Sequence, residues 1–379
     1  MSIFFIIFFT LYSSLHAYLF IKAWYSFRFR FTAGCIIAVM LACFIAAPLV
    51  VRFLENAGHE TSARVVAYGG YVWMAFIFLF FVIAISIDVA RLSGVVFAKV
   101  LNVGTPQFIS AHLLFFMIAS TAAVAVCTYG FFEAQSIRTE RVRIDTSKLP
   151  EGLERLTIVQ ISDVHLGLII REKRLRDIVK AIRRADPHVL VSTGDLVDGQ
   201  INDLKKLINM LDGVKPRYGK YAVMGNHEFY AGIEVSREFT EKSGFTLLRG
   251  EGVTIEGILN IAGVDDAVSK RYHEKVIEQE RAALEGLPRE LFTVLLKHRP
   301  LVEDSSIGLF DLQLSGHTHN GQIFPFTYLT RLAFPMYAGL HQIEGDALLY
   351  VSRGTGTWGP PIRFLAPPEV TVIELIGRK

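Results

Sequence analysis

The sequence predicts an N-terminal four-helix transmembrane bundle followed by an α/β domain, in which two β-sheets form a sandwich flanked by helices. Two observations support this prediction. Four nearly charge-free apolar runs lie before residue 132, and they hold most of the excess that brings the hydrophobic share of the chain to 51%. After residue 155, short apolar runs alternate with segments of helical spacing, and five of these runs end in Asp, Asn or His. Such alternation is typical of α/β folds, whose sites lie beyond the carboxyl ends of the strands.

The four apolar runs have the length of membrane-spanning helices. We expect helices at about residues 3–21, 33–51, 65–87 and 109–129, within a transmembrane domain of residues 1–131. Each run is close to the ~20 residues that cross a hydrocarbon layer of ~30 Å, whereas buried helices of soluble proteins are shorter or amphipathic. The first run has no basic N-terminal region and no small-residue cleavage site, so we expect a membrane helix rather than a removable signal peptide.

Lys and Arg in the short loops indicate how the bundle is oriented. The predicted first and third loops carry five basic residues, whereas the second balances Arg52 and Arg64 with Glu55 and Glu60. This distribution favours an integral protein of the cell (inner) membrane with loops one and three inside, so that the C-terminal domain lies outside the cytoplasm. The basic residues that follow the fourth run, from Arg138 onward, favour the opposite orientation.

Charge and cysteine content exclude several classes of partner and site. The net charge of +3 is too small to argue for nucleic acid, and the chain has no long basic run with interleaved aromatic residues. The partner that composition does predict is the lipid bilayer itself. The three cysteines, Cys35, Cys43 and Cys127, all lie inside apolar runs. Their positions exclude a disulfide framework and a thiolate metal site in the C-terminal domain. The sequence leaves the oligomeric state open.

A change of composition separates the two domains. Residues 132–154 are charged, carry turn signals at 149–152, and form a connecting segment in which the alternation of residues 137–144 predicts a strand. Residues 155–379 then form the α/β domain. Helical spacing predicts helices around 175–182, 204–211, 234–242 and 272–284, and residues 253–262 predict a hairpin. We expect the last two strands, 348–352 and 370–375, to close the second sheet.

The five strands that end in Asp, Asn or His predict a metal site. Singly, an Asp after a strand is often a helix N-cap and a lone His is more often a core residue. All of these side chains occur together and in order, which favours a common site. The candidates are Asp163, His165, Asp195, Asp198, Asn226, His227, His298, His317 and His319.

These motifs resemble a known set. D-V-H at 163–165, G-D-L-V-D at 194–198, G-N-H-E at 225–228, His298 and G-H-T-H at 316–319 are similar, in order, to the motifs of calcineurin-like metallophosphoesterases, over about residues 155–376. N-G-Q at 320–322, S-R-G-T-G at 352–356 and P-P-E-V at 367–370 resemble the subgroup of membrane-associated bacterial phosphoesterases. That subgroup more usually has Gly where this chain has Asn320, a residue that tolerates positive φ better than most.

The resemblance implies two divalent metal ions that share one carboxylate. It assigns Asp163, His165, Asp195 and His319 to one ion, and Asp195, Asn226, His298 and His317 to the other. The glycine before Asp195 gives the backbone room for this approach. Two such ions lower the pKa of a bridging water and so generate a hydroxide nucleophile at neutral pH. Mixed nitrogen and oxygen ligands admit Mn, Fe, Zn, Co or Ni, of which we expect Mn.

Two further residues have implied roles beside the metals. His227 is expected to be catalytic, because the family uses this imidazole to stabilise the phosphoryl oxygens or to protonate the leaving group. Asp198 is expected to orient a ligand or a loop rather than to bind metal. The sequence therefore predicts a membrane-anchored, metal-dependent phosphoesterase.

The segment Ile323 to Leu340 bears on the substrate. It is apolar and aromatic, contains two prolines, and has Arg331 as its only charge. It either packs on the core or forms a hydrophobic rim beside the metals. A rim would favour lipid-linked or amphipathic substrates, with Arg331 meeting a second phosphate.

Two other functions stay open. One is a pyrophosphatase of a nucleotide-diphosphate glycolipid, as in some relatives, and the other is a membrane sensor whose phosphoesterase domain binds a ligand. A degenerate ligand set would favour the sensor, and no expected ligand is missing. A transporter is disfavoured because the apolar runs lack recurring charged or Gly/Pro-broken pairs.

Overall fold

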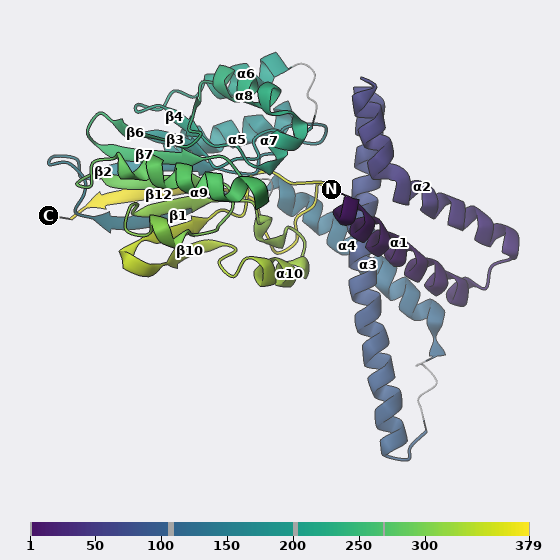
Figure 1. Ribbon diagram of the computed structural model, residues 1–379. Coiled ribbons are helices and arrows are strands. Elements are labelled where there is room, and N and C mark those ends of the chain that lie inside the picture. Colours follow the sequence, from purple (N-terminus) through teal and green to yellow (C-terminus); the bar gives the residue numbers. More distant parts are fainter. Residues whose placement is uncertain (1, 105–109, 200–203, 268–269, 379) are drawn as a thin grey trace. The chain divides into compact units, whose positions relative to one another are not determined.

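The computed structural model describes residues 2–104, 110–199, 204–267 and 270–378 (Figure 1). The chain forms two compact units. One comprises the residues up to 132 together with 359–362, and the other comprises 133–358 and 363 onward. The second, which we call the catalytic unit, contains every candidate site residue of the sequence.

The first unit consists of long apolar helices. They are α1 Ser2–Phe27, α2 Phe31–Asn56, α3 Glu60–Val100 and α4 His112–Gln135. Within the described residues all four are long and apolar enough to cross a membrane. The third is much longer than the expected run 65–87, because residues 88–100 contain no proline to end it. The expected fourth run starts at residue 109, which lies outside the described residues. In the bundle, Asp88 accepts a hydrogen bond from Tyr18 Oη at 2.8 Å and pairs with Lys22.

The catalytic unit is built on two six-stranded sheets. The first has the order β1-β12-β2-β3-β4-β5 and the second β10-β11-β9-β8-β7-β6. The strands of the first sheet are β1 Arg138–Thr146, β2 Arg155–Ile161, β3 Val189–Ser192, β4 Lys220–Ala222, β5 Thr246–Leu247 and β12 Glu369–Gly377. The strands of the second sheet are β6 Glu251–Ile255, β7 Leu259–Val264, β8 Phe292–Lys297, β9 Leu312–Ser315, β10 Gly339–Gln342 and β11 Leu348–Val351.

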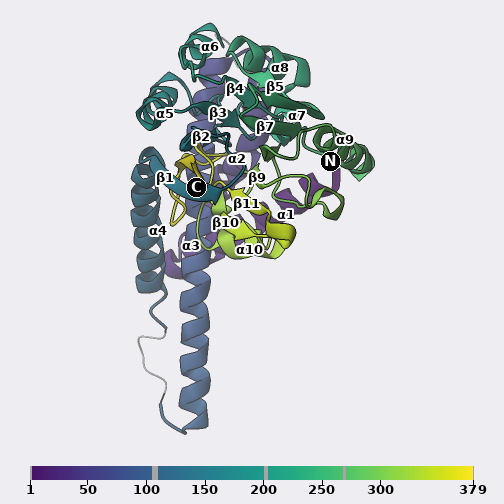
Figure 2. The same ribbon diagram turned by 90° about the vertical axis from the view of Figure 1, so that its left-hand side faces the viewer.

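The catalytic unit also contains helices. They are α5 Glu172–Ala185, α6 Leu204–Asp212, α7 Asn226–Ala231, α8 Ile233–Lys242, α9 Lys270–Glu285 and α10 Phe326–Ala333, with short 3₁₀ turns η2 Asp304–Ser306, η3 His319–Gly321 and η4 Glu344–Asp346. Helices α5, α6 and α8 lie side by side (Figure 2), and α9 packs against β6 and β7 of the other sheet.

Alternation along the strands explains the layers. Ile158 of β2 points into a core shared with Ile261 and Leu314 of the second sheet. Its neighbour Val159 points the other way, into a core shared with Ile178 of α5. Because successive side chains of a strand face opposite sides, a strand buried on both faces has a continuous apolar sequence.

One expectation about the strands is confirmed and another needs revision. The strand expected at 137–144, in the connecting segment, is confirmed as β1, which pairs with β12 along its whole length in the first sheet. The strand expected at 370–375 was placed in the second sheet, and this is wrong: β12 lies between β1 and β2 in the first. Val372 and Ile373 face opposite cores there, which requires a central position. By contrast, the predicted hairpin at 253–262 is confirmed as β6 and β7.

Parallel pairing determines where the site forms. Strands β2, β3 and β4 are parallel to one another, as are β7, β8 and β9. The loops after β2, β3, β4, β8 and β9 carry the sequence candidates. Since the carboxyl ends of parallel strands meet at one edge, these loops share one end of the sandwich.

Candidate metal centre

Three overlapping groups of buried or half-buried donors lie at this end of the sandwich. Within each group the donor atoms are all within 4.8 Å of one another. The groups are Asp163, His165 and His319; His165, Asp195 and His227; and Asp195, His298 and His317. Asp195 belongs to two of them, and His165 links the first to the second.

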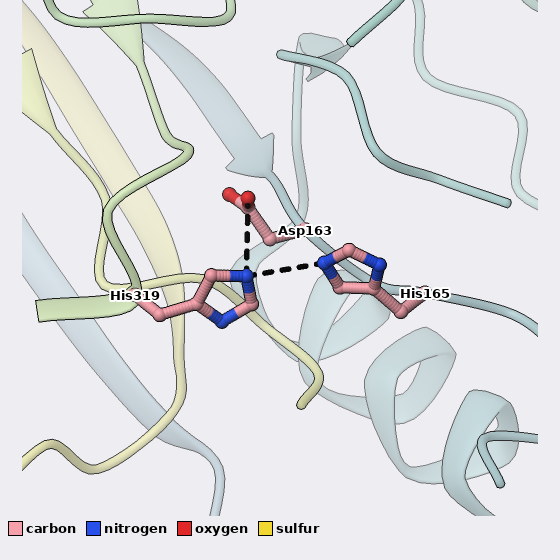
Figure 3. A group of neighbouring side chains, drawn as sticks. All are labelled: Asp163, His165 and His319. Carbon is pink, nitrogen blue, oxygen red and sulfur yellow. Dashed lines mark hydrogen bonds and ion pairs between the residues drawn. The ribbon is translucent and has the colours of Figure 1, made fainter. Parts of the chain in front are cut away.

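The first group brings two rings and a carboxylate to one point (Figure 3). His319 Nε2 lies 3.4 Å from Asp163 Oδ1 and 3.1 Å from His165 Nε2. His165 Nε2 also lies 3.9 Å from Asp195 Oδ2. All of these side chains are buried. Two ring nitrogens that face each other beside carboxylate oxygens form a set of donors suited to one cation.

The third group approaches the same oxygen of Asp195, Oδ2, as His165 does. His298 Nε2 lies 3.2 Å from Asp195 Oδ2, from Asn226 Oδ1 and from His317 Nδ1. The second ring nitrogen of His298 is 2.8 Å from the Thr193 carbonyl, which fixes the orientation of the ring. The amide oxygen of Asn226 thus belongs to this cluster, although its side chain is not ionisable.

The backbone of the donor loops adopts an uncommon conformation. Asp163, His165, Asp195, His317 and His319 all have φ between +48° and +71°. Non-glycine residues in this left-handed region cost on the order of 1–3 kcal/mol each and concentrate at functional sites. Five such residues in one cluster indicate that the loops are held by their surroundings.

Close contacts with glycine residues help to keep the donor loops in this conformation. A Cβ on Gly316 would lie 2.2 Å from Asp163 Oδ2, and one on Gly225 would lie 2.2 Å from Asp195 Oδ1. A Cβ on Gly194 would lie 2.8 Å from His298 Nδ1. Glycine is therefore required at these positions because the carboxylates and the ring lie directly against the neighbouring backbone.

The rings of three candidate donors are neutral. Burial lowers the pKa of His165 to about 4 and that of His317 to about 3, and neighbouring histidines add to both effects. Burial and the Arg363 guanidinium hold the pKa of His319 well below its usual range. A neutral imidazole is the form that binds a metal ion, so these three rings are ready to do so near pH 7.

Asp195 is ionised in this setting. Burial raises its pKa, but His298 and His227 outweigh burial and hold the pKa of the carboxyl well below its usual range. Oδ1 also accepts a hydrogen bond of 2.9 Å from the backbone N–H of His227. Both oxygens of Asp195 are therefore engaged, one by backbone and one by ring nitrogens.

His227 is held by a second carboxylate. Its Nδ1 lies 2.9 Å from Asp198 Oδ1. Burial lowers the pKa of His227, but Asp195 and Asp198 outweigh it and raise the value to about 9. Tyr230 and Trp358 contact the ring edge-on, at centroid distances of 5.5 and 5.6 Å. The imidazole is thus protonated and oriented, with aromatic groups beside it.

Comparison with known proteins identifies the family. The chain matches the family model of the calcineurin-like phosphoesterase over residues 156–321. It is 41% identical over 257 residues to an uncharacterized metallophosphoesterase of Aquifex aeolicus, a match that covers 68% of this chain and 98% of that protein. The chain belongs to the calcineurin-like metallophosphoesterase family. It is accordingly a metal-dependent phosphoric ester hydrolase.

Other relatives of this metallophosphoesterase include one that is named as a transmembrane protein. A transmembrane protein with metallophosphoesterase domain from Danio rerio is 35% identical over 268 residues, 67% of this chain and 61% of that protein. An uncharacterized metallophosphoesterase of Bacillus subtilis is 31% identical over 281 residues, 69% of this chain and 94% of that protein. The chain thus spans about three fifths of the Danio rerio relative and almost all of the two bacterial ones.

Two sequence candidates lie outside the donor groups. Asp198 contacts His227 and has its Oδ2 3.7 Å from His165 Nδ1. Arg331 is exposed on α10. Helix α10 adjoins η3, the turn that contains His319, so Arg331 is close in sequence and in the fold without touching the centre.

Glu228 is a residue of the metallophosphoesterase site that sequence reasoning missed. Its buried carboxylate accepts hydrogen bonds from the backbone N–H groups of Asp195, Leu196, Val197 and Gly225, at 2.6–3.2 Å. It therefore ties the loop after β3 to the loop after β4. The G-N-H-E motif contained the signal, but nothing in the sequence indicates that this Glu binds two loops.

Arg363 is a second missed residue. It is fully buried and donates to the carbonyl oxygens of Gly356, Arg353 and Ala366, while its Nη2 lies 3.1 Å from His319 Nδ1. It links the segment before β12 to a metal-site ring 44 residues earlier in the chain. No sequence pattern around residue 363 predicts its contact with His319.

Replacing Glu228 with Gln is expected to destabilise the catalytic unit and to weaken metal binding. Gln keeps one acceptor oxygen, so its NH₂ must face two of the four backbone N–H donors. Buried donors left without a partner cost about 1–3 kcal/mol each, and we expect a loss of at least about 2 kcal/mol. Thermal unfolding and metal content provide the measurement. Glu234→Gln, at an exposed carboxylate on α8, is the control, and equal stability of both variants would contradict the role of Glu228.

Proposed function

We propose that the protein is a membrane-anchored metallophosphoesterase with a dinuclear metal site, which hydrolyses phosphoester bonds in lipid-linked or amphipathic substrates. The observation that carries this proposal is the position of Asp195 Oδ2, which lies 3.9 Å from His165 Nε2 and 3.2 Å from His298 Nε2, between the two proposed sets of ligands. A shared carboxylate is what a two-metal site requires, because both ions must act on one substrate phosphate.

The donors fit two divalent ions. One ion would be held by Asp163, His165, Asp195 and His319, and the other by Asp195, Asn226, His298 and His317. Two aspartates leave a pair of divalent ions with net positive charge, which suits a phosphate group. No cysteine follows Cys127, and mixed nitrogen and oxygen donors admit Mn, Fe, Zn, Co or Ni, among which we propose Mn.

The side chains around the ions would have separate roles in catalysis. When bound, the ions would activate a water molecule for attack on phosphorus and withdraw charge from the phosphate oxygens. His227 is protonated and oriented by Asp198, so it can give its proton to the departing oxygen or donate a hydrogen bond to the phosphoryl group. Asp198 acts by holding the ring in place.

Apolar groups beside the centre support an amphipathic substrate. Phe334 contacts the ring of His317 at 5.3 Å, and Trp358 and Tyr230 flank His227. Trp358 is held in position by Gln322, which both donates to and accepts from its backbone at 2.9 Å. A leaving group next to His227 would therefore meet aromatic surface.

The charges of the first three loops support one orientation in the membrane. We propose that the catalytic unit lies outside the cytoplasm at the inner membrane, because the first and third loops are the more basic ones. A reporter that is active only outside the cytoplasm, fused after Lys379, tests this proposal. Activity of a cytoplasm-only reporter at the same position would contradict it and would favour a nucleotide-linked glycolipid as the substrate.

A substrate panel tests the proposed function. The full-length protein, purified in detergent with added Mn²⁺, would be assayed on nitrophenyl phosphomonoesters and phosphodiesters, nucleotide-diphosphate sugars, and phospholipids of increasing acyl length. We expect metal-dependent hydrolysis whose catalytic efficiency rises with acyl length on one phosphoester. Equal efficiency on short and long chains would contradict the lipid-linked substrate, and binding without hydrolysis of any ester would favour a sensor.

A further inference from the structure

Helix α10 has its polar and apolar faces reversed. Thr330 is buried and Thr327 is half-buried, whereas Phe326, Tyr328, Leu329 and Leu332 are exposed by 48%, 61%, 57% and 82%. A helix on the surface of a soluble domain normally turns its apolar side chains inward. The sequence alone left open whether this segment packs on the core, and the exposure of these four side chains shows that α10 does not.

Thr327 and the backbone of η3 hold α10 in this orientation. Thr327 Oγ1 donates to the Asn320 carbonyl at 3.0 Å, and Thr330 Oγ1 donates to the Phe326 carbonyl at 3.3 Å. A Cβ on Gly321 would lie 2.5 Å from Thr327 Cα, so η3 and α10 are in direct backbone contact. Rotating the helix to bury its leucines would break the bond to Asn320, which directly follows His319.

Exposed apolar side chains are concentrated on this helix. Within the described residues of the catalytic unit, ten large apolar side chains are exposed, and four of them lie on the eight residues of α10. The only charge on the helix is that of Arg331, and no acidic residue accompanies it. A short apolar face with one cation matches a lipid surface, where leucine and aromatic side chains enter the acyl boundary and a basic side chain meets phosphate.

The catalytic unit is joined directly to a helix that could cross a membrane. Helix α4 ends at Gln135 and β1 begins at Arg138, so two residues separate a membrane-capable helix from the first strand of the catalytic unit. A connection this short holds the catalytic unit at the bilayer surface at high effective concentration. Lipid is therefore the apolar partner that is always present.

We propose that α10 is an interfacial helix that inserts Leu329, Leu332 and their aromatic neighbours into the lipid surface. Because Thr327 bonds the residue after His319, the insertion would bring the metal loop to the level of the lipid head groups. The proposal rests on the membrane anchor of the proposed function, but it concerns lipid contact by α10 and can hold whichever ester is cleaved.

A site-specific probe tests the contact without measuring hydrolysis. In a background with Cys35, Cys43 and Cys127 replaced by Ala, Leu332→Cys would carry an environment-sensitive fluorophore. Val235→Cys, on α8, is the matched control, because Val235 is an apolar side chain that is 53% exposed in the same unit. Both proteins would be placed, one copy each, in phosphatidylcholine and phosphatidylglycerol nanodiscs that contain nitroxide-labelled lipid.

We expect the probe at position 332 to be quenched several-fold more strongly than the probe at 235. Equal quenching at the two positions, whether weak or strong, would overturn the proposal. So would a blue-shifted but unquenched probe at 332, since that result would show that protein covers the helix. Leu329→Ser with Leu332→Ser provides a second arm: this variant should lose the preference for long acyl chains while a small nitrophenyl ester is hydrolysed at an unchanged rate. An unchanged preference would count against the proposal.

Discussion

The Asp195→Asn variant is expected to lose hydrolysis almost completely and to bind at most one metal ion. Asp195 Oδ1 accepts from the backbone N–H of His227, while Oδ2 faces His298 and His165. Asn has one oxygen for these two tasks. In one orientation its NH₂ meets a backbone donor, and in the other it replaces the oxygen that faces the metal donors.

The expected loss is large because, in the proposed dinuclear site, the carboxylate serves both ions. Metal ions contribute several kcal/mol of transition-state stabilisation, and about 1.4 kcal/mol corresponds to tenfold in rate, so activity should fall by at least about 10³-fold. Asp145→Asn, at an exposed residue of β1 that pairs with Arg143, is the control. Elemental analysis that finds two ions bound to an active Asp195→Asn protein would refute the assignment.

The second large effect is expected at His227. His227→Ala should lower kcat by about 10²–10⁴-fold while metal content stays that of the wild type, because the ring acts on the substrate and not as a ligand. If the ring protonates the leaving oxygen, the loss should be smaller for a nitrophenyl ester, whose leaving group needs no proton, than for an alkyl ester.

The Asp198→Asn variant tests how far the activity depends on the orientation of the His227 ring, as distinct from the presence of that ring. It keeps His227 but weakens the bond to Nδ1, so we expect a smaller loss than with His227→Ala and the same dependence on leaving group. Loss of metal from His227→Ala would show that this ring is a ligand, as its proximity to His165 and Asp195 allows.

The site could be predicted from sequence to the extent that its parts are local. Asp163 and His165 follow β2, and His317 and His319 follow β9, so an apolar run and its terminal residues mark each position. Parallel pairing then brings the loops together, and this needs only the order of strands. The conformation of the loops does not follow from such patterns, since left-handed backbone at Asp195 depends on contacts with Gly225 and Glu228 from another loop.

Long-range pairing limited the prediction of the fold. Residues 370–375 have a sequence suited to a central strand in either sheet, and only the pairing of β12 with β1 and β2 decides between them. The position of Arg363 also depends on long-range contacts. A basic residue between apolar neighbours in the sequence gives no sign that it will be fully buried against His319. The outward orientation of the apolar face of α10 could not be predicted either, since the spacing of apolar residues does not reveal which side of a helix faces outward.

The most direct test of the dinuclear site is a titration of the metal-free, full-length protein with Mn²⁺. Bound ions and hydrolysis of a nitrophenyl phosphodiester would be followed together. The two donor groups that share Asp195 predict two ions per chain at saturation, with activity that reaches its maximum only when the second ion is bound. Full activity with one ion per chain, or with none, would contradict the dinuclear site.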